Sequence, residues 1–374
     1  MIEHIDRTRR AFTDIAAHKP VVVLAGGGAN CEGDLVFAAE AATRPLMAFA
    51  VRHTSGYLCV ALPGIDCDRL NLPPMSSTND GRLDTAFTVT VDAAHGISTG
   101  ISAADRAHTV RTLADPATTT ADLARPGHVL PLRSCDGGVL RRPGRAEAAV
   151  DLVHGAGLLP AAAFAGIVSP RNPTEMARRD ELIAFAADHG LCHVSLADLV
   201  AYRRRSERHV TRISSGRLRT RYGTFVAHRY SCSLDGAEHM ALALGDLTAG
   251  TSVGAVSAAV HVECMAGEIF GSTVCHCGEH LDGALKSVAE TGRGVVVYWR
   301  PPPGQASGSC SFRATRRPSF MSRHFLSQYA VAAEILADLE TGPVQLVSGS
   351  TEAVGALEDW GVTVEIPTEL KAIS

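Results

Sequence analysis

Short apolar runs alternate with helical spacings along the first half of the chain. Residues 20–28, PVVVLAGGG, have the pattern of a buried strand that ends in a glycine turn, and residues 34–53 follow with apolar positions at helical spacing. Further strand patterns occupy 57–62, 87–92 and 163–168, and further helical patterns occupy 146–157 and 178–190. Strands that alternate with helices in this way predict an α/β fold built on a mixed sheet.

The stretch 203–221, which holds eight arginines, interrupts this alternation. Strand patterns resume after it, at 223–230, 240–247 and 253–264. We therefore expect two mixed-sheet α/β domains, 1–206 and 207–374. The arginines themselves indicate either a phosphate or RNA site or a solvated helix end followed by a linker, and we favour the second because runs of charge are usually solvated.

The last part of the chain contains one segment without apolar periodicity. Residues 298–325 are rich in Pro, Gly, Ser and Arg, which predicts a long mobile loop. The patterns beyond it predict helices at 328–340 and 351–361 and strands at 343–350 and 362–366.

Composition limits the classes of function. Of the 374 residues, 46% are hydrophobic and 20% charged, so a chain of this length has ample apolar surface for two cores. The net charge of -4 argues against a nucleic-acid partner. The N-terminus lacks the apolar core of a secretory signal, and no apolar run approaches the roughly 20 residues of a membrane span. We expect a cytoplasmic protein that acts on a small molecule, with no membrane or nucleic-acid partner.

Three of the ten cysteines have the spacing of metal ligands. Cys264, Cys275 and Cys277 form a Cys-x10-Cys-x-Cys pattern, and Gly278 allows a tight turn beside it. Soft thiolates select zinc or iron-sulfur clusters, and catalytic zinc sites typically have three protein ligands with water as the fourth. The alternatives are three buried thiols, or a structural zinc site that a distant His or Cys completes.

Four groups near these cysteines are candidates for proton transfer at such a site: His261, Glu263, His276 and His280. The alternative for each of the four is a position at the surface, or a contact with a metal ligand rather than with the metal itself.

Longer motifs resemble a known family. Residues 261–300, HVECMAGEIFGSTVCHCGEHLDGALKSVAETGRGVVVYWR, are similar to the zinc-binding core of GTP cyclohydrolase II. The first half resembles 3,4-dihydroxy-2-butanone-4-phosphate synthase in the motifs CEGDLVFAAEAAT, VRHTSGYLCVAL, FTVTVDAAHGISTGISAADRAHTV and RPGHVLPLR. Together these motifs cover nearly the whole chain, in the order of the bifunctional riboflavin-biosynthesis family.

This resemblance implies a site and a reaction. It places one zinc ion per chain on Cys264, Cys275 and Cys277, with water as the fourth ligand. It implies hydrolytic opening of the imidazole ring of GTP with loss of formate and pyrophosphate, and it suggests a homodimer.

The synthase half departs from the family at three positions. The magnesium-ligating Glu of the family falls on Asn30, its magnesium-ligating His falls on Arg145, and a catalytic Glu falls on Gly166. A guanidinium cannot bind a cation, so we expect no Mg²⁺ here. Arg145 would instead bind an anionic substrate or pair with Glu32.

Other positions still match the family and would shape a sugar-phosphate pocket, or else only maintain the fold. With Glu32 and Arg145, the candidate substrate-binding residues are Asp34, His53, Cys59, Asp105, Arg106, His128 and Arg142.

The cyclohydrolase half also departs from the family. Ala259 and His280 replace an Arg and a Gln, a phosphate clamp is lost in 300–308, and further family positions fall near Phe325, Ser327 and Ala353. The charge of a triphosphate would then be poorly compensated.

From these departures we expect a zinc-dependent hydrolase that acts on a C–N bond of a heterocycle other than GTP, with a synthase half that is inactive in the family reaction. One alternative is a non-catalytic, zinc-stabilised scaffold or regulatory paralogue. A second alternative is authentic synthesis of riboflavin precursors from GTP and ribulose 5-phosphate.

Overall fold

The computed structural model describes residues 2–27, 31–76, 86–234, 236–248, 254–301, 328–347 and 351–365. The chain divides into two compact units, Met1–Arg203 and Arg204–Ser374. Helix α7 (Leu196–Ser206) runs through this division and ends at the expected boundary after residue 206. The expected boundary coincides with the C-terminal end of this helix and remains a prediction.

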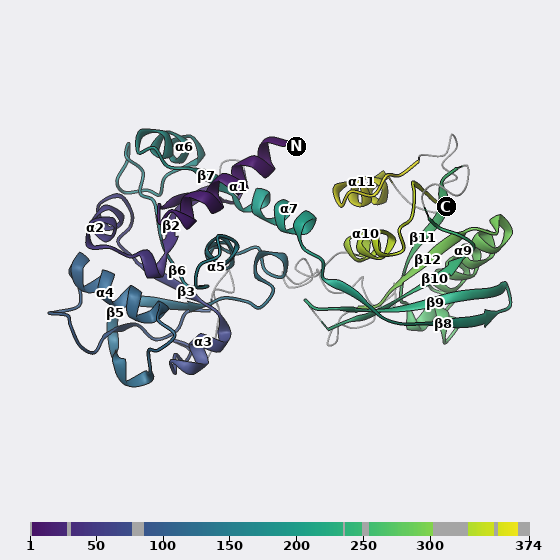
Figure 1. Cartoon of the computed structure of the whole chain (residues 1–374), viewed down its shortest axis with the longest axis horizontal. Helices are drawn as coiled ribbons and strands as arrows, with labels where there is room; N and C mark the ends of the chain where they lie inside the picture. Colours follow the sequence, from purple (N-terminus) through teal and green to yellow (C-terminus); the bar gives the residue numbers. More distant parts are fainter. Residues whose placement is uncertain are drawn as a thin grey trace. The chain divides into compact units, whose positions relative to one another are not determined.

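The N-terminal unit is built on a seven-stranded mixed sheet with the order β4-β5-β3-β6-β2-β1-β7 (Figure 1). Only the pairs β3·β5 and β1·β7 are parallel. Its strands are β1 (Val21–Ala25), β2 (Glu32–Ala38), β3 (Cys59–Leu62), β4 (Val91–Ala93), β5 (Leu123–Arg133), β6 (Ala162–Gly166) and β7 (His193–Ser195). Its helices before α7 are α1 (Ile2–Ala16), α2 (Arg44–His53), α3 (Gly64–Arg69), α4 (Ala103–Ala114), α5 (Arg145–Gly155) and α6 (Arg179–Asp188).

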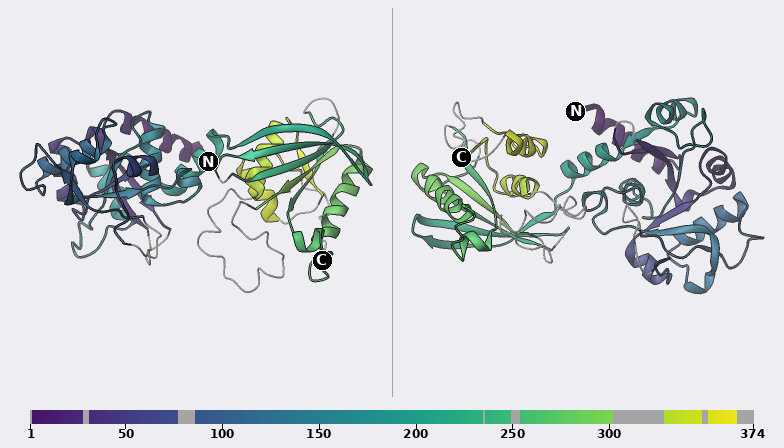
Figure 2. Two further views of the ribbon diagram at one scale, coloured as in Figure 1. Left: turned by 90° about the horizontal axis from the view of Figure 1, so that it is seen from below. Right: turned by 180° about the vertical axis from the view of Figure 1, so that it is seen from behind.

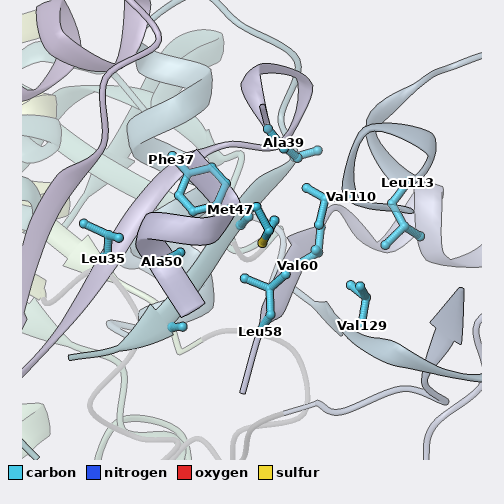
Figure 3. Close-up of a cluster of buried hydrophobic side chains, with 14 of the residues drawn as sticks. Leu35, Phe37, Ala39, Met47, Ala50, Leu58, Val60, Val110, Leu113 and Val129 are labelled. Atoms are coloured by element: carbon cyan, nitrogen blue, oxygen red, sulfur yellow. The ribbon is translucent and has the colours of Figure 1, made fainter. Parts of the chain in front are cut away.

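Helices cover both faces of this sheet. In β1, Val22 and Leu24 belong to a core with residues of α2, α4 and α6, whereas Val21 and Val23 pack with residues of α1, α5 and α7. Figure 3 shows part of the first core, where Met47 of α2 lies among the side chains of the sheet. A strand buried on both faces is an uninterrupted apolar run, which is why VVVL identified β1 from the sequence.

The helix expected over 34–53 is wrong in its first part. Residues Glu32–Ala38 form β2, which pairs with β1 and β6, a 3-10 turn spans Ala39–Ala41, and α2 starts only at Arg44. A short fully apolar run has no period that separates a buried strand from a helix.

The C-terminal unit contains a six-stranded mixed sheet with the order β13-β11-β12-β10-β9-β8. The residues of β12 alternate between two cores: Val295 and Val297 pack with α10 and α11, and Val296 packs with α9. The helices thus cover opposite faces of the sheet (Figure 2). The elements are β8 (Val210–Thr220), β9 (Gly223–Cys232), β10 (Glu238–Leu244), β11 (Val256–Val262), α8 (Met265–Glu268), α9 (Cys277–Thr291), β12 (Gly294–Trp299), α10 (Gln328–Asp338), β13 (Val344–Leu346) and α11 (Thr351–Asp359).

Two expectations for this half need correction. The arginine-rich stretch is no linker, because most of it forms β8, an edge strand whose side chains are nearly all exposed and which pairs with β9 along its length. The strand expected at 362–366 is reduced to a single bridge from Val364 to Val344. Most of the expected loop 298–325 lies outside the described residues.

Among the helices that the structure describes, none is both long and apolar enough to cross a membrane.

Candidate functional site

The three spaced cysteines converge in the C-terminal unit. Cys264 follows β11 and caps α8, and Cys277 is the first residue of α9 rather than part of a turn or strand edge. The three sulfurs lie within 4.8 Å of one another, and those of Cys264 and Cys275 are 3.8 Å apart. Two thiolates on a tetrahedral zinc, with bonds of about 2.3 Å, lie roughly 3.8 Å apart. The cluster therefore fits zinc with three protein ligands.

Two glycines let the connection between these cysteines fold back on itself. A Cβ atom on Gly278 would lie 2.7 Å from the carbonyl oxygen of Gly267, and one on Gly267 would lie 2.8 Å from Sγ of Cys275. Any side chain at either position would force the thiolate-bearing segments apart. Gly278 was expected from the sequence as a place of tight folding, and the close approach to Gly267 is its physical reason.

A carboxylate that the sequence analysis missed organises the same region. Oε1 of Glu268 accepts the amide N–H of Cys264 at 2.6 Å and hydrogen-bonds Nε2 of His261 at 2.8 Å. Its Oε2 accepts the hydroxyl of Tyr298 at 2.5 Å. Burial and this carboxylate raise the pKa of Tyr298, so the phenol stays protonated as a donor. The signal in the sequence was the i,i+4 spacing from Cys264 to Glu268 across one helical turn.

The four groups expected to transfer protons are not equally placed. His261 is buried and reaches the cysteine region through Glu268. Glu263 forms an ion pair with Arg300 at 3.1 Å. His276 and His280 are exposed on the first turn of α9, with ring centroids 6.4 Å apart. Of the four, His261 is the one that shares a hydrogen-bonding partner, Glu268, with Cys264.

A cavity of about 360 Å³ lies in the same unit. Tyr298 lines it, so the phenol that contacts Glu268 also borders this space. The volume is within the range of ligand pockets. Its other lining residues are Arg229, Glu238, His239, Met240, Leu242, Leu281, Leu285, Val296 and Arg300.

In the N-terminal unit, two carboxylates of β2 meet Arg145 at the start of α5. Nη2 of Arg145 contacts Oε2 of Glu32 at 2.5 Å, and Nη1 contacts Oδ1 of Asp34 at 3.5 Å. Arg178 approaches the other oxygen of Glu32 at 3.5 Å. Oδ2 of Asp34 is buried and has no hydrogen-bond partner within the described ranges.

Burial determines the ionisation of this group. The pKa of Asp34 is raised to about 6, because burial outweighs the opposing charge of Arg145. Burial, and then the charge of Asp34, raise the pKa of the nearby Cys59 thiol to about 12, so that thiol is neutral and a poor nucleophile. The position of Gly166 is also close, because a Cβ there would lie 3.7 Å from Oδ1 of Asp34 and 2.6 Å from Cε of Met176.

These contacts determine whether the group around Arg145 can bind Mg²⁺. Mg²⁺ requires an octahedral set of oxygen ligands. The guanidinium of Arg145 lies between the two carboxylates and carries donors only, so the residues present do not fit a divalent cation. Asn30 lies outside the described residues.

The remaining candidate residues of the sugar-phosphate pocket have local partners. Asp105 accepts the hydroxyl of Ser98 at 2.7 Å, and this hydrogen bond is the main cause that lowers its pKa. Arg106 donates to the carbonyl of Gly56 at 2.9 Å.

His128 contacts Asp92 at 2.7 Å, and Nε of Arg142 donates to Glu147 at 2.9 Å. His53 lies in an aromatic cluster with Phe49, Phe185 and His189, where burial lowers its pKa. A role of these side chains in binding a substrate remains a prediction.

Both halves of the chain match family models. Residues 9–202 match 3,4-dihydroxy-2-butanone 4-phosphate synthase, and residues 211–368 match GTP cyclohydrolase II. The riboflavin biosynthesis protein RibBA of Rhodococcus jostii is 47% identical over 96% of this chain and 89% of its own length. The protein of the same name from Salinispora arenicola is 47% identical over 96% of this chain and 88% of its own length.

Two similar solved structures are described by the synthase activity. RibBX of A. baumannii, described as a two-domain 3,4-dihydroxy-2-butanone 4-phosphate synthase, is 29% identical, has a TM-score of 0.74, and covers 97% of this chain and 99% of its own. A 3,4-dihydroxy-2-butanone 4-phosphate synthase in complex with two magnesium ions is 38% identical, has a TM-score of 0.51, and covers 53% of this chain and 96% of its own.

The expectation of a hydrolase for a heterocycle other than GTP is contradicted by these relatives, which match nearly the whole chain and are named for riboflavin biosynthesis. It relied on a few substituted positions in a single sequence. Two of them, Phe325 and Ser327, lie outside the described residues, and Ala259 is packed in the sheet core.

Proposed function

The chain belongs to the riboflavin-biosynthesis family that joins a 3,4-dihydroxy-2-butanone 4-phosphate synthase to a GTP cyclohydrolase II, and from this premise we propose that its C-terminal unit opens the imidazole ring of GTP. The observation that supports this most is the cluster of Cys264, Cys275 and Cys277, which would hold zinc. Zinc so bound would supply a Lewis acid and lower the pKa of a coordinated water.

The residues around the cluster would orient the ligands and hold a proton. Glu268 fixes the backbone of Cys264, and its contact with His261 provides a carboxylate–imidazole pair that can accept a proton during hydrolysis. Tyr298 donates to Glu268, which leaves the phenol ring to form part of the cavity wall.

The neighbouring cavity would take the substrate. Its apolar residues suit the faces of a purine, and Arg229 and Arg300 supply charge for phosphate oxygens. Each arginine is paired with a carboxylate, Glu238 or Glu263, and an incoming phosphate would compete for the guanidinium.

A second candidate reaction is the formation of 3,4-dihydroxy-2-butanone 4-phosphate from ribulose 5-phosphate in the N-terminal unit. It is favoured by RibBX, which has the same two-domain extent and is described by that activity. We also propose, from the family resemblance alone, that the chain is a homodimer, which light scattering on the purified protein would test.

The test of the GTP reaction is formate release by zinc-loaded protein. We expect wild type to release formate from GTP and Cys275→Ser to lose this activity, since the variant retains only two thiolates. Cys135→Ser, which removes a thiol of the other unit, serves as the matched control and should retain wild-type turnover. Folded, zinc-loaded wild type that releases no formate would reject the proposal.

A further inference from the structure

The group around Arg145 is balanced in charge. Above the pKa of Asp34, Glu32 and Asp34 contribute two negative charges, and Arg145 and Arg178 contribute two positive charges. A divalent cation that entered this group would find no uncompensated negative charge. It would also have to displace a guanidinium that already contacts both carboxylates.

Arg145 cannot yield this place by losing its proton. A guanidinium has five donors and no acceptor, and although burial lowers the pKa of Arg145, the contacts with Asp34 and Glu32 outweigh it and raise that pKa. Arg145 is the first residue of α5 and both carboxylates lie on the interior strand β2, so regular secondary structure fixes the backbone positions of all three.

One polar atom of the group is left for a ligand. Oδ2 of Asp34 is buried and accepts no hydrogen bond from the described residues, although its neighbour Oδ1 faces Arg145. A buried acceptor without a donor is costly unless a bound molecule supplies one. A hydroxyl group of a ligand would supply that donor.

We propose that Arg145 is a built-in cation which replaces a divalent metal between Glu32 and Asp34, so that the N-terminal unit binds a hydroxylated, sugar-like ligand without metal. A synthase relative that is 38% identical is described as a complex with two magnesium ions. The Arg145 group belongs to the unit that does not hold the cysteine cluster, so loss of the GTP reaction would leave this metal-free site untouched.

Binding of Mn²⁺, followed by electron paramagnetic resonance on the zinc-loaded full chain, tests the metal part. We expect wild type to leave millimolar Mn²⁺ free in solution. Arg145→His, which exchanges the guanidinium for a possible ligand, should gain a bound Mn²⁺ signal that a second change, Glu32→Gln, removes. The matched control is Arg178→Gln, which weakens the pairing of Glu32 but retains Arg145 and should gain no signal.

Two results would overturn the proposal. One is Mn²⁺ bound by wild type and lost in Glu32→Gln. The other is a folded Arg145→His protein that gains no Mn²⁺, since the guanidinium would then not be what excludes the metal.

Wild type alone provides a check that needs no variant. Its thermal unfolding should be unchanged by millimolar Mg²⁺ but shifted upward by ribulose 5-phosphate in the presence of EDTA. A shift by the sugar phosphate that appears only with Mg²⁺ would contradict a metal-free site.

Discussion

Glu268 is the residue on which the geometry of the cysteine cluster most depends. One carboxylate holds the amide of Cys264, the ring of His261 and the hydroxyl of Tyr298. Groups that fix metal ligands in this way tune both affinity and reactivity, although they do not touch the ion.

Replacing this carboxylate should weaken zinc binding. We expect Glu268→Gln to lower the affinity for zinc by about tenfold to a hundredfold, because an amide offers one acceptor oxygen where two are used. Competition with a zinc-binding dye measures this affinity. Glu279→Gln, an exposed change on the same motif, is the control and should bind zinc like wild type. Equal affinities of Glu268→Gln and Glu279→Gln for zinc would show that Glu268 does not support the cysteine cluster.

Asp34 should make the stability of the N-terminal unit dependent on pH. Burial raises its pKa in the folded state to about 6, above the ordinary value of an aspartate, so the folded state binds the proton more tightly. The resulting stabilisation is complete below the unfolded pKa and is lost as the pH rises through the folded pKa.

The variant Asp34→Asn lacks this titration. Relative to wild type, it should therefore gain about 1–3 kcal/mol in free energy of unfolding between about pH 4 and about pH 7. Urea unfolding at the two pH values measures the change. The exposed Asp188→Asn should show no such gain. If the difference between Asp34→Asn and wild type were the same at both pH values, the buried titration would be absent.

Among single residues, those that belong to a recognisable spacing motif could be predicted from the sequence. The convergence of Cys264, Cys275 and Cys277 could be expected from the motif, as could the pairing of Arg145 with Glu32. Glu268 and Tyr298 could not be connected, because their contact joins α8 to β12 across 30 positions of sequence.

The two elements that carry the cysteines are held together by the contact between Gly267 and Gly278. The first turn of α9 lies against α8 so closely that no Cβ fits at Gly278. Gly283, in the same helix, has no atom within 4 Å of its Cβ position. A comparison of Gly278 with Gly283 therefore distinguishes the effect of close packing on stability from the effect of helix propensity.

We expect Gly278→Ala to destabilise the C-terminal unit by about 1–3 kcal/mol, since the added methyl group overpacks the contact with Gly267. Gly283→Ala should instead stabilise it by about 0.5–1 kcal/mol, because alanine favours a helix interior. Urea unfolding of both variants measures the difference. If both variants changed the free energy of unfolding in the same direction, the close contact between Gly278 and Gly267 would be contradicted.

Elements with a distinct helical period were predicted from the sequence, whereas one apolar run and one exposed strand were not. The amphipathic patterns at 178–190 and 328–340 correspond to α6 and α10. The apolar run of β2 was assigned to a helix, because strand pairing with β1 and β6 decides its state and leaves no local signature. The exposed strand β8 was missed because nearly all its side chains are exposed, and its pairing with β9 leaves no pattern of apolar residues along it.

The molecule as a whole consists of two units with separate cores. A metal that binds the folded cluster contributes to the stability of its own unit only. Removal of zinc by a chelator should therefore lower the unfolding temperature of the C-terminal unit and leave that of the N-terminal unit unchanged.

Differential scanning calorimetry measures this effect, and Cys275→Ser identifies the C-terminal transition. A chelator that shifted the N-terminal transition instead would show that the metal is bound in the other unit.

Elemental mass spectrometry on protein purified without added metal measures whether the three cysteines hold zinc. We expect about one zinc per chain in wild type and in Cys135→Ser, and close to none in Cys275→Ser. Wild type without zinc, or zinc retained in full by Cys275→Ser, would contradict it.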